Sequence, residues 1–516
     1  MWSCDVFGEV PVITRADRNR GGAKLAILSA VAIAATACSS GGHSPATYAH
    51  LTARIRPVAP ATSVLDGGPD ALAAGLASKL LTAAPVVVVG STGRRGGLSQ
   101  AAAWAEAAHA PLLLTSPQSA KGQAALREEV SDLHPDAVLA AGVSRTALAR
   151  QLGRVRVVSR PAGLPSTRAP VPAGHEVVLL HRGHSAAVAA AVAATARVAG
   201  AQVIEIRGYD PRADPAAIRA LAAARPSRVI AIGSRFGPAR RLAARVAVAA
   251  TGVQLPGESQ VMFPGRRLVA LYGHPGTPAL GALGQQGLAA SIARVRRAAL
   301  PYRRLSRVPV VPAFEIIATV AEGSPGPDGT YSYQTPLAQL RPWVRRATRA
   351  RMYVVLDLQP GRASLLAQAK KYAPLLERPN VGLALDPEWK LQPGQKPLRQ
   401  IGEVSITEVN SVVRWLARLT AQHHLPQKLL VLHQFRLSMI QNERRLDTHE
   451  DDIAIVIHMD GQGSPGDKQQ TWEGVLGAAP RGVFFGWKDF YVKDHPMLTP
   501  QQTMDRRPQP VMISYQ

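Results

Sequence analysis

Eight apolar segments in the second half of the chain constrain its fold more than any other feature of the sequence. Most of them are separated by stretches with the periodicity of amphipathic helices, such as Gly287–Ala299 and Thr407–His423. Eight strands alternating with helices over roughly 250 residues predict a (β/α)8 barrel that spans residues 266–516. The predicted strands are, in order, Arg267–His274, Val311–Ala321, Tyr353–Gln359, Val381–Trp389, Leu429–Phe435, Ile453–Asp460, Gly482–Tyr491 and Pro510–Gln516.

Polar and aromatic residues gather at the carboxyl ends of these predicted strands. Active sites of (β/α)8 barrels lie at this end, where loops leave the strands. The polar group comprises His274, Glu322, Asp357, Asp386, Glu388, His433, Gln434, His458, Asp460, Lys488 and Asp489. The aromatic group comprises Trp389, Trp487, Phe490, Tyr491 and Tyr515, whose flat apolar faces suit sugar rings. The sequence therefore predicts a pocket at the mouth of the barrel.

The first hypothesis for this pocket is glycoside hydrolysis, which requires one carboxylic acid and a second carboxylate on the opposite face of the sugar. Glu388, at the end of the fourth strand, is the candidate acid, with Asp386 beside it. Asp460 and Asp489 are the candidates for the second carboxylate. Substrate contacts are expected from His433, Gln434, His458, Trp389, Trp487, Lys488, Tyr491, Asp357 and His274. This hypothesis includes no metal ion and no cofactor.

The segment Gly382–Trp389 (GLALDPEW) resembles the acidic fourth-strand motif of chitinase-like barrels, in which D-x-E ends the strand. Asp386 and Glu388 match that ending. The earlier acidic positions of the motif are occupied by Val381 and Ala384 here. The resemblance therefore implies a glycosidase-like barrel with its proton donor on the fourth strand, but it does not imply substrate-assisted chemistry.

Two alternatives use the same residues. His274, His433 and His458, together with Asp386 or Glu388, are the residue types that hold Zn²⁺ in a metal-dependent hydrolase. The first predicted strand lacks the His-x-His pair that would strengthen the metal-hydrolase hypothesis. The other alternative is a barrel that binds wall glycan without cleaving it, since a fold does not imply an activity.

The first half of the chain predicts a different α/β region over residues 61–260. Short apolar runs alternate with helical stretches, a pattern typical of a parallel sheet covered on both faces. The pattern occurs twice, on either side of a proline-rich linker at 160–174, which predicts a duplicated layout. The runs are Pro85–Gly90, Pro111–Thr115, Ala137–Gly142 and Val155–Ser159, then Glu176–Leu180, Gln202–Ile206 and Arg228–Gly233.

Three motifs in this region resemble the second type of bacterial cell-wall-binding repeat. They are DALAA at Asp70–Ala74, APLLLT at Ala110–Thr115 and LHPDAV at Leu133–Val138, with a strand ending at Gly142. The resemblance covers Asp66 to Ser159 and implies non-covalent binding to anionic wall polymers. Neither a G-x-G-x-x-G motif nor a P-loop follows a predicted strand, so the sequence predicts no nucleotide site.

The N-terminus reads as a secretory signal. Basic residues from Arg15 to Lys24 precede an uncharged run, Leu25–Ala37, of about 13 residues, which is shorter than the roughly 20 that span a bilayer. Small residues then lead directly to Cys38. This arrangement resembles the lipobox of bacterial lipoproteins, although Ala35 stands where the family usually has leucine.

The lipobox resemblance implies a signal peptide at 1–38, a lipidated Cys38, a tether at 39–60 and an exported protein anchored to the outer face of the cell membrane. The alternative is an ordinary cleaved signal followed by a cysteine without a role. Only Cys4 and Cys38 occur, so cleavage would leave a single thiol and no internal disulfide.

The chain has a formal net charge of +25. For an exported protein, this charge indicates anionic lipid headgroups and cell-wall or envelope polysaccharide as partners, and not nucleic acid.

Overall fold

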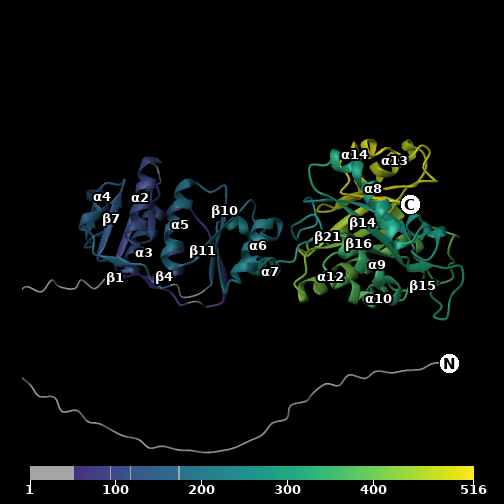
Figure 1. Cartoon of the computed structure of the whole chain (residues 1–516), viewed down its shortest axis with the longest axis horizontal. Helices are drawn as coiled ribbons and strands as arrows, with labels where there is room; N and C mark the ends of the chain where they lie inside the picture. The colour runs from purple at the N-terminus through teal and green to yellow at the C-terminus, as the bar shows by residue number, and fades with distance from the viewer. Residues whose placement is uncertain (1–50, 58, 93–94, 117, 172–174) are drawn as a thin grey trace, which may run out of the picture. The chain divides into compact units, whose positions relative to one another are not determined.

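The computed structural model describes residues 51–516 apart from 58, 93–94, 117 and 172–174 (Figure 1). The expected signal peptide and Cys38 lie outside the described residues, so they stay predictions. In the described part of the chain, no helix is both long and apolar enough to span a membrane.

The first α/β region contains two four-stranded parallel sheets. The first has the order β6-β5-β7-β8, and the second has the order β11-β10-β12-β3. The first sheet consists of β5 (Val86–Ser91), β6 (Leu112–Thr115), β7 (Ala137–Ala141) and β8 (Val157–Val158). The second consists of β3 (Ala61–Leu65), β10 (Glu176–His181), β11 (Gln202–Ile206) and β12 (Arg228–Ile232). The predicted alternation of strands and helices is therefore present, and β3, from before the first sheet, pairs with β12 in the second.

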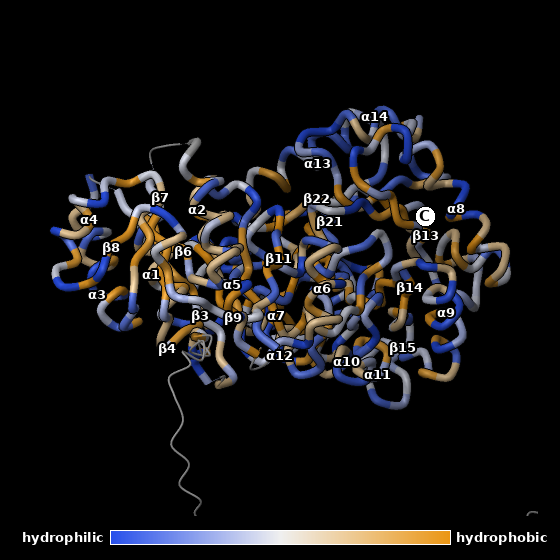
Figure 2. The backbone as a smooth tube through the Cα atoms, turned by 60° about the vertical axis from the view of Figure 1, so that its left-hand side comes forward, coloured by the Kyte–Doolittle hydropathy of each residue, from blue (hydrophilic) through white to orange (hydrophobic). Residues whose placement is uncertain are grey.

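Seven helices accompany these sheets in the described residues. They are α1 (Pro69–Leu80), α2 (Arg95–Ala107), α3 (Ala120–Leu133), α4 (Arg145–Leu152), α5 (Ala186–Ala199), α6 (Pro215–Ala224) and α7 (Ala239–Ala250). Short strands β1 (Leu51–Thr52), β2 (Arg54–Ile55), β4 (Leu81–Ala83) and β9 (Thr167–Arg168) complete the region. All residues of β6 and β7 are buried, as continuous apolar strands of a covered parallel sheet require, and both read as hydrophobic in Figure 2.

The second half forms a closed barrel of eight parallel strands, which confirms the predicted (β/α)8 architecture. Its strands follow the order β13-β23-β22-β21-β19-β17-β16-β14, and β14 pairs with β13 to close the ring. The barrel strands are β13 (Arg267–Gly273), β14 (Val310–Ala321), β16 (Tyr353–Leu358), β17 (Val381–Leu385), β19 (Lys428–Gln434), β21 (Ile453–Met459), β22 (Phe484–Asp489) and β23 (Met512–Tyr515). A short antiparallel strand, β15 (Ser332–Gln334), extends the end of β14.

Helices follow most of the barrel strands. They are α8 (Leu288–Leu305), α9 (Leu337–Arg349), α10 (Leu365–Lys371), α11 (Ala373–Leu376), α12 (Ile406–Gln422), α13 (Pro465–Ala478) and α14 (Pro500–Met504). The Ser405 side chain caps α12 by accepting from the Glu408 N–H, and the helix buries residues spaced three and four apart. Between β19 and β21 the described chain forms only short 3-10 turns and β20 (Ile440–Gln441), which pairs with β18 (Val404–Ser405).

Alternate residues of each barrel strand point inward, because successive side chains of a strand face opposite sides. The inward residues nearest the amino ends are apolar and form one buried cluster. It includes Leu268, Ala270, Val311, Ala313, Tyr353, Val355, Ala384, Leu429, Val431, Ala454, Val456 and Met512. This apolar plug fills the lower part of the barrel, so any site must lie above it.

Candidate functional site

A ring of polar side chains lies directly above the apolar plug. Each of the eight strands contributes the next inward residue, two positions after its last plug residue or, on β22, two after Gly486. All eight are buried. They are Tyr272, Glu315, Asp357, Asp386, His433, His458, Lys488 and Ser514. Buried charges are costly unless they are paired, so the contacts within this ring decide which groups are ionised.

His433 and Lys488 are the cations of the ring. His433 Nε2 lies 3.1 Å from Glu315 Oε1, and its Nδ1 lies 3.2 Å from Asp460 Oδ2. Lys488 Nζ lies 3.0 Å from Asp460 Oδ1. Burial lowers the pKa of His433, but Glu315 and Asp460 outweigh burial, and its pKa is well above the ordinary value. Burial opposes the charge of Lys488 too, and Asp460 and Glu315 again produce a net rise in its pKa.

Asp460 is held as a carboxylate by these two cations. Burial raises the pKa of Asp460, but Lys488 and His433 lower it by more than burial raises it. The pKa of Asp460 is therefore far below its ordinary value. Asp460 therefore stays ionised at any pH at which the protein is expected to work.

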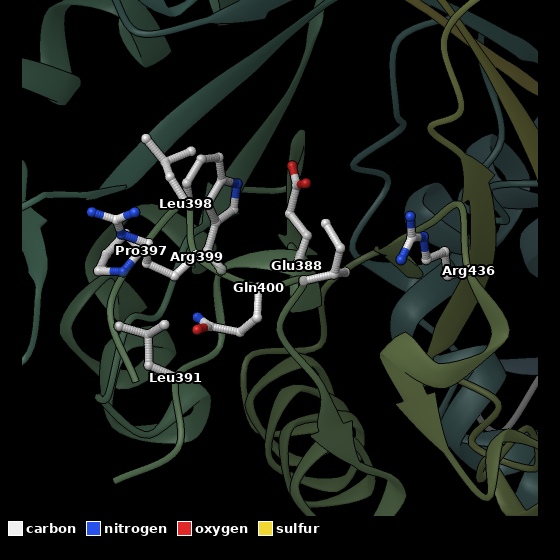
Figure 3. Close-up of a pocket in the computed structure, with 9 residues that line it drawn as sticks. Glu388, Leu391, Pro397, Leu398, Arg399, Gln400 and Arg436 are labelled. Atoms are coloured by element: carbon white, nitrogen blue, oxygen red, sulfur yellow. The ribbon is translucent and has the colours of Figure 1, made fainter. Parts of the chain in front are cut away.

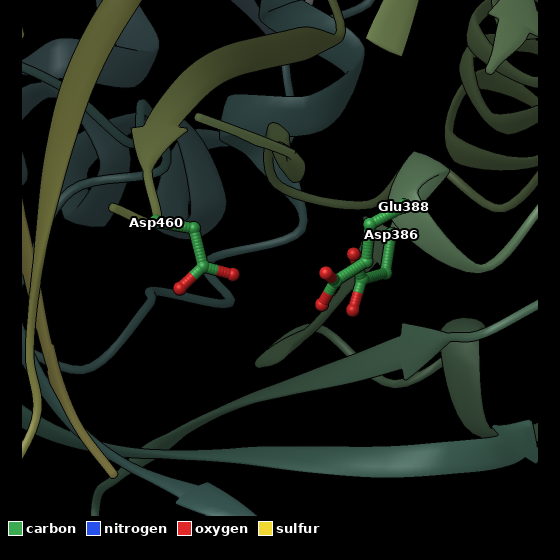
Figure 4. Close-up of side chains that lie close together, drawn as sticks. All are labelled: Asp386, Glu388 and Asp460. Carbon is green, nitrogen blue, oxygen red and sulfur yellow. The ribbon is translucent and has the colours of Figure 1, made fainter. Parts of the chain in front are cut away.

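The pKa values of Asp386 and Glu388 are shifted upward instead. Burial is the main cause of both rises, and neighbouring carboxylates add to them. The pKa of Asp386 is well above its ordinary value, and that of Glu388 is raised to about 7. Asp386 Oδ1 has no hydrogen-bond partner among the described residues. Oxygen atoms of Asp386, Glu388 and Asp460 lie within 4.8 Å of one another (Figure 4). The site thus combines a fixed anion with two carboxyl groups that retain protons near neutral pH.

Tyr272 and Asp357 form a rigid wall of the ring. The Tyr272 hydroxyl donates to Asp357 Oδ2 over 2.9 Å and accepts from Gln359 Nε2 at 3.4 Å. Lys488 Nζ lies 3.6 Å from the centre of the Tyr272 ring, which places a cation over an aromatic face. Burial raises the pKa of Asp357 to about 6. Lys488 thus contacts the Tyr272 ring as well as Asp460.

His458 is the neutral member of the ring. Its Nε2 lies 2.8 Å from Ser514 Oγ, and its ring stacks on His433 with centroids 5.3 Å apart. Gly486 leaves room for it, since a Cβ at that position would lie 2.9 Å from His458 Nδ1. Burial lowers the pKa of His458 to about 4.

We expect His458→Gln to change how stability depends on pH. The folded wild type keeps His458 neutral down to about pH 4, whereas its unfolded chain takes up a proton below its ordinary pKa of 6.5. The free energy of unfolding of the wild type should therefore fall, relative to His458→Gln, by about 3 kcal/mol as pH drops from 6.5 to 4. Urea denaturation of both proteins at several pH values measures this difference. Parallel pH profiles would show that His458 is protonated in the folded protein.

Two adjoining cavities open above the ring. One, of about 490 Å³, is lined by Glu388, Asp460, Lys488, Gln359 and Phe490 among others. The other, of about 400 Å³, shares Glu388, Trp389, Leu398 and Arg436 with the first (Figure 3). Both volumes suit a small-molecule or sugar ligand. Glu388 and Trp389 therefore stand at the boundary between two compartments of one groove.

A 3-10 turn, η6 (Pro387–Trp389), positions Glu388 directly after β17. The Gly402 N–H donates to the Glu388 carbonyl oxygen over 2.7 Å. A Cβ on Gly402 would lie 2.3 Å from the Lys390 carbonyl oxygen and 2.6 Å from that of Glu388. Lys390 Nζ in turn lies 3.0 Å from Glu408 Oε1 at the start of α12. The segment carrying Glu388 is thus fixed by backbone contacts that only glycine permits at position 402.

The structure brings most of the sequence-predicted site residues together. Asp357, Asp386, His433, His458 and Lys488 belong to the polar ring, while Glu388, Asp460 and Trp389 line the cavities above it. His274 is at the rim, where its Nε2 lies 3.1 Å from Thr335 Oγ1.

Four other predicted residues face away from the ring. Trp487 Nε1 donates to Asp489 Oδ1 over 2.7 Å, on the face of β22 opposite to Lys488. Gln434 donates to Glu443 Oε2 over 2.8 Å. Tyr491 stacks on Tyr515 with centroids 5.4 Å apart. Asp489, Trp487, Gln434 and Tyr491 line neither cavity above the ring.

Three ring residues were not predicted from the sequence: Glu315, Tyr272 and Ser514. Glu315 is a charged residue inside the otherwise apolar strand β14, two positions after the inward-facing Ala313. A charged residue two positions after an inward-facing apolar residue is a signal that the sequence contains. The predicted Glu322 lies beyond the end of β14. Tyr272 follows Ala270 in the same way, but an aromatic residue in an apolar strand carries no such contrast.

The three histidines of the metal-hydrolase alternative do not converge. Both ring nitrogens of His433 face carboxylates, His458 Nε2 faces Ser514, and His274 Nε2 faces Thr335. Within the described residues, the one group with ligand atoms close enough for a metal ion is Asp386, Glu388 and Asp460.

Comparison with family models and with curated proteins finds no match to this sequence.

Proposed function

We propose that the barrel is a glycoside hydrolase that cleaves an envelope polysaccharide, with Glu388 as general acid and Asp460 as the second carboxylate. The observation that supports this most directly is the divergence of two neighbouring carboxyl groups. The pKa of Glu388 is raised to about 7, mainly by burial, whereas Lys488 and His433 outweigh burial and hold the pKa of Asp460 far below its usual range. Environments that push two pKa values apart assign an acid and a base within one site.

The short distance between the carboxyl groups favours a retaining mechanism. Retaining enzymes separate the two groups by roughly 5–5.5 Å, and inverting enzymes by roughly 6.5–9.5 Å to admit a water. The nearest oxygens of Glu388 and Asp460 lie within 4.8 Å of each other, which is below the inverting range.

In the first step, Asp460 attacks the anomeric carbon while the glycosidic C–O bond breaks, and Glu388 gives its proton to the leaving oxygen. In the second step, the Glu388 carboxylate takes a proton from water, and the water oxygen displaces Asp460.

The surrounding residues suit a sugar. Trp389 and Phe490 line the 490 Å³ cavity and offer apolar faces for a pyranose ring. Asp386 is buried beside Glu388 and lines neither cavity. Lys488 and His433 keep Asp460 ionised and oriented, so they position the reacting carboxylate.

The rest of the chain is consistent with an envelope location. We propose that residues 61–260 form a duplicated, cell-wall-binding-like region, and that Cys38 carries a lipid anchor on an exported protein. In support, β5 and β10 are each flanked by the next two strands along the chain, β6 and β7 or β11 and β12. The net charge of +25 favours an anionic polymer as the partner.

The test uses the soluble chain beginning at Ser39, incubated with purified envelope glycans and a panel of chromogenic glycosides. Reducing ends report cleavage, and co-sedimentation with the polymer reports binding. Wild type is compared with Glu388→Gln and with Glu377→Gln, which changes an exposed glutamate outside both cavities. Cleavage that is lost only in Glu388→Gln supports the proposal. Binding without cleavage in every protein would leave a wall-binding barrel instead.

The carboxylate group Asp386, Glu388 and Asp460 favours one second candidate, a hydrolase that uses a divalent cation bound to oxygen ligands. Lys488, at 3.0 Å from Asp460, already supplies a positive charge there. We therefore expect hydrolysis to persist in excess EDTA. Loss of activity in EDTA that returns on adding Mg²⁺, Mn²⁺ or Zn²⁺ would establish the metal-dependent mechanism.

Gly402→Ala is expected to displace the turn that carries Glu388. The added Cβ would lie 2.3 Å from the Lys390 carbonyl oxygen, and a misplaced acid loses catalytic power steeply. We expect kcat to fall at least about tenfold, with a modest loss of thermal stability. Gly477→Ala is the matched control, since a Cβ at Gly477 in α13 meets no atom within 4 Å. Equal kcat for the two variants would show that η6 tolerates the shift.

A further inference from the structure

We propose that the 400 Å³ cavity beside Glu388 is a subsite for an anionic group of the substrate, which makes the substrate an acidic polysaccharide. This inference rests on the proposed glycosidase function and specifies its substrate class. We call this cavity the arginine subsite, after Arg399 and Arg436 in its lining.

The two arginines reach the subsite from different segments. Arg399 precedes β18 and Arg436 follows β19, and Figure 3 shows their guanidinium groups on opposite sides of Glu388. Among the described residues, neither guanidinium has a carboxylate or hydrogen-bond partner. By contrast, Arg362 Nη2 donates to the Gln395 carbonyl oxygen over 3.0 Å. Arg399 and Arg436 thus keep their donors available for a ligand.

The remaining polar groups of the subsite favour an acceptor-rich ligand. Glu388 is the single carboxyl group among its lining residues, against two guanidinium groups. Trp389 Nε1 is a buried donor with no acceptor among the described residues. Either guanidinium fork matches two oxygens of a carboxylate or a phosphate.

The position of Leu398 supports a polymer that extends from one cavity into the other. It is 84% exposed and lines both cavities. Its φ of +63° lies in the left-handed region, which is unusual for a bulky residue and is often found at ligand-binding positions. A glycan that lies across Leu398 and Trp389 would place its scissile bond at Glu388 and the adjacent sugar in the arginine subsite.

The test measures binding by calorimetry with three probes: tetragalacturonate, its carboxyl-reduced neutral counterpart and a glycerol phosphate oligomer. The galacturonate and phosphate probes separate a uronate from a phosphodiester as the source of the anion. The proteins are the full soluble chain, Arg399→Gln/Arg436→Gln, and the control Arg345→Gln/Arg349→Gln. The control removes the same charge from exposed positions on α9.

We expect the wild type to bind at least one anionic probe, and the subsite variant to bind it at least about tenfold more weakly, equivalent to about 1.4 kcal/mol. The control variant should bind within about twofold of wild type, and no protein should prefer the neutral counterpart. Equal weakening in both variants would assign binding to overall charge and overturn the proposal. Failure of the wild type to bind either anionic probe would overturn it too.

Cleavage measured in the same samples separates this inference from the proposed function. Arginine-dependent binding without cleavage of any glycan would keep the subsite and reject the hydrolase. Cleavage of neutral glycosides with no effect of Arg399→Gln/Arg436→Gln on any probe would keep the hydrolase and reject the subsite.

Discussion

Glu388→Gln is expected to lower kcat/KM by about 10²- to 10⁴-fold on any natural glycoside that the wild type cleaves. The amide keeps the size of the side chain but has no acidic proton for the leaving oxygen. Substrates whose leaving group needs no protonation, such as dinitrophenyl glycosides, should lose much less in the glycosylation step. The control Glu377→Gln should leave kcat/KM unchanged for both kinds of substrate.

The pH profile gives the same assignment independently. The reaction requires protonated Glu388, whose pKa burial raises to about 7, so wild-type kcat/KM should fall as pH rises above about 7. The required ionisation of Asp460 is complete well below that pH, because Lys488 and His433 outweigh its burial. The descending alkaline limb should be missing from residual Glu388→Gln activity. An unchanged limb in that variant would move the acid role to another group, with Asp386 as the next candidate.

Asp460→Asn is expected to reduce hydrolysis by about 10³-fold or more, for activated and natural leaving groups alike, since it removes the nucleophile itself. Added azide should restore cleavage of an activated glycoside and yield a glycosyl azide of inverted configuration. Wild type should release its product with retained configuration, which proton NMR of the first-formed anomer measures. A wild-type product of inverted configuration would contradict the assignment of Asp460 as nucleophile.

The Asp460→Asn result needs a stability control. The substitution leaves Lys488 and His433 buried with less negative charge, so part of an activity loss could come from unfolding. Thermal melting of the variant, compared with Asp505→Asn at an exposed position, separates the two causes. Azide rescue occurs only in a folded site, so it decides the matter when the melting temperature falls.

The fold was predictable because two independent periodicities agree. Strand-length apolar runs recur between helical stretches, and that rhythm leaves few architectures other than a closed parallel barrel. Strand boundaries were correct to within a few residues; β17, for example, ends at Leu385 and gives way to η6 before Trp389. Between the fifth and sixth barrel strands, β19 and β21, the described chain contains no α-helix.

The site was only partly predictable, because adjacent residues at a strand end face opposite directions. Lys488 and Asp489 read alike in the sequence, yet one joins the polar ring and the other lies behind β22 with Trp487. Gly486 faces His458 inside the barrel, so Lys488, two residues later, also faces inward and Asp489 faces outward. Arg399 and Arg436 were not predicted, since they lie on connecting segments whose course no periodicity reveals.

The loop from Lys390 to Gly402 links recognition to reactivity. It bears Leu398 and Arg399, and Gly402 at its end holds the backbone of Glu388. A long polymer that engages this loop would therefore also steady the proton donor. A fragment too short to reach the loop should bind more weakly and also turn over slowly, because the contacts it lacks include those that hold the acid in place. Chain length of the substrate should thus appear in kcat as well as in KM.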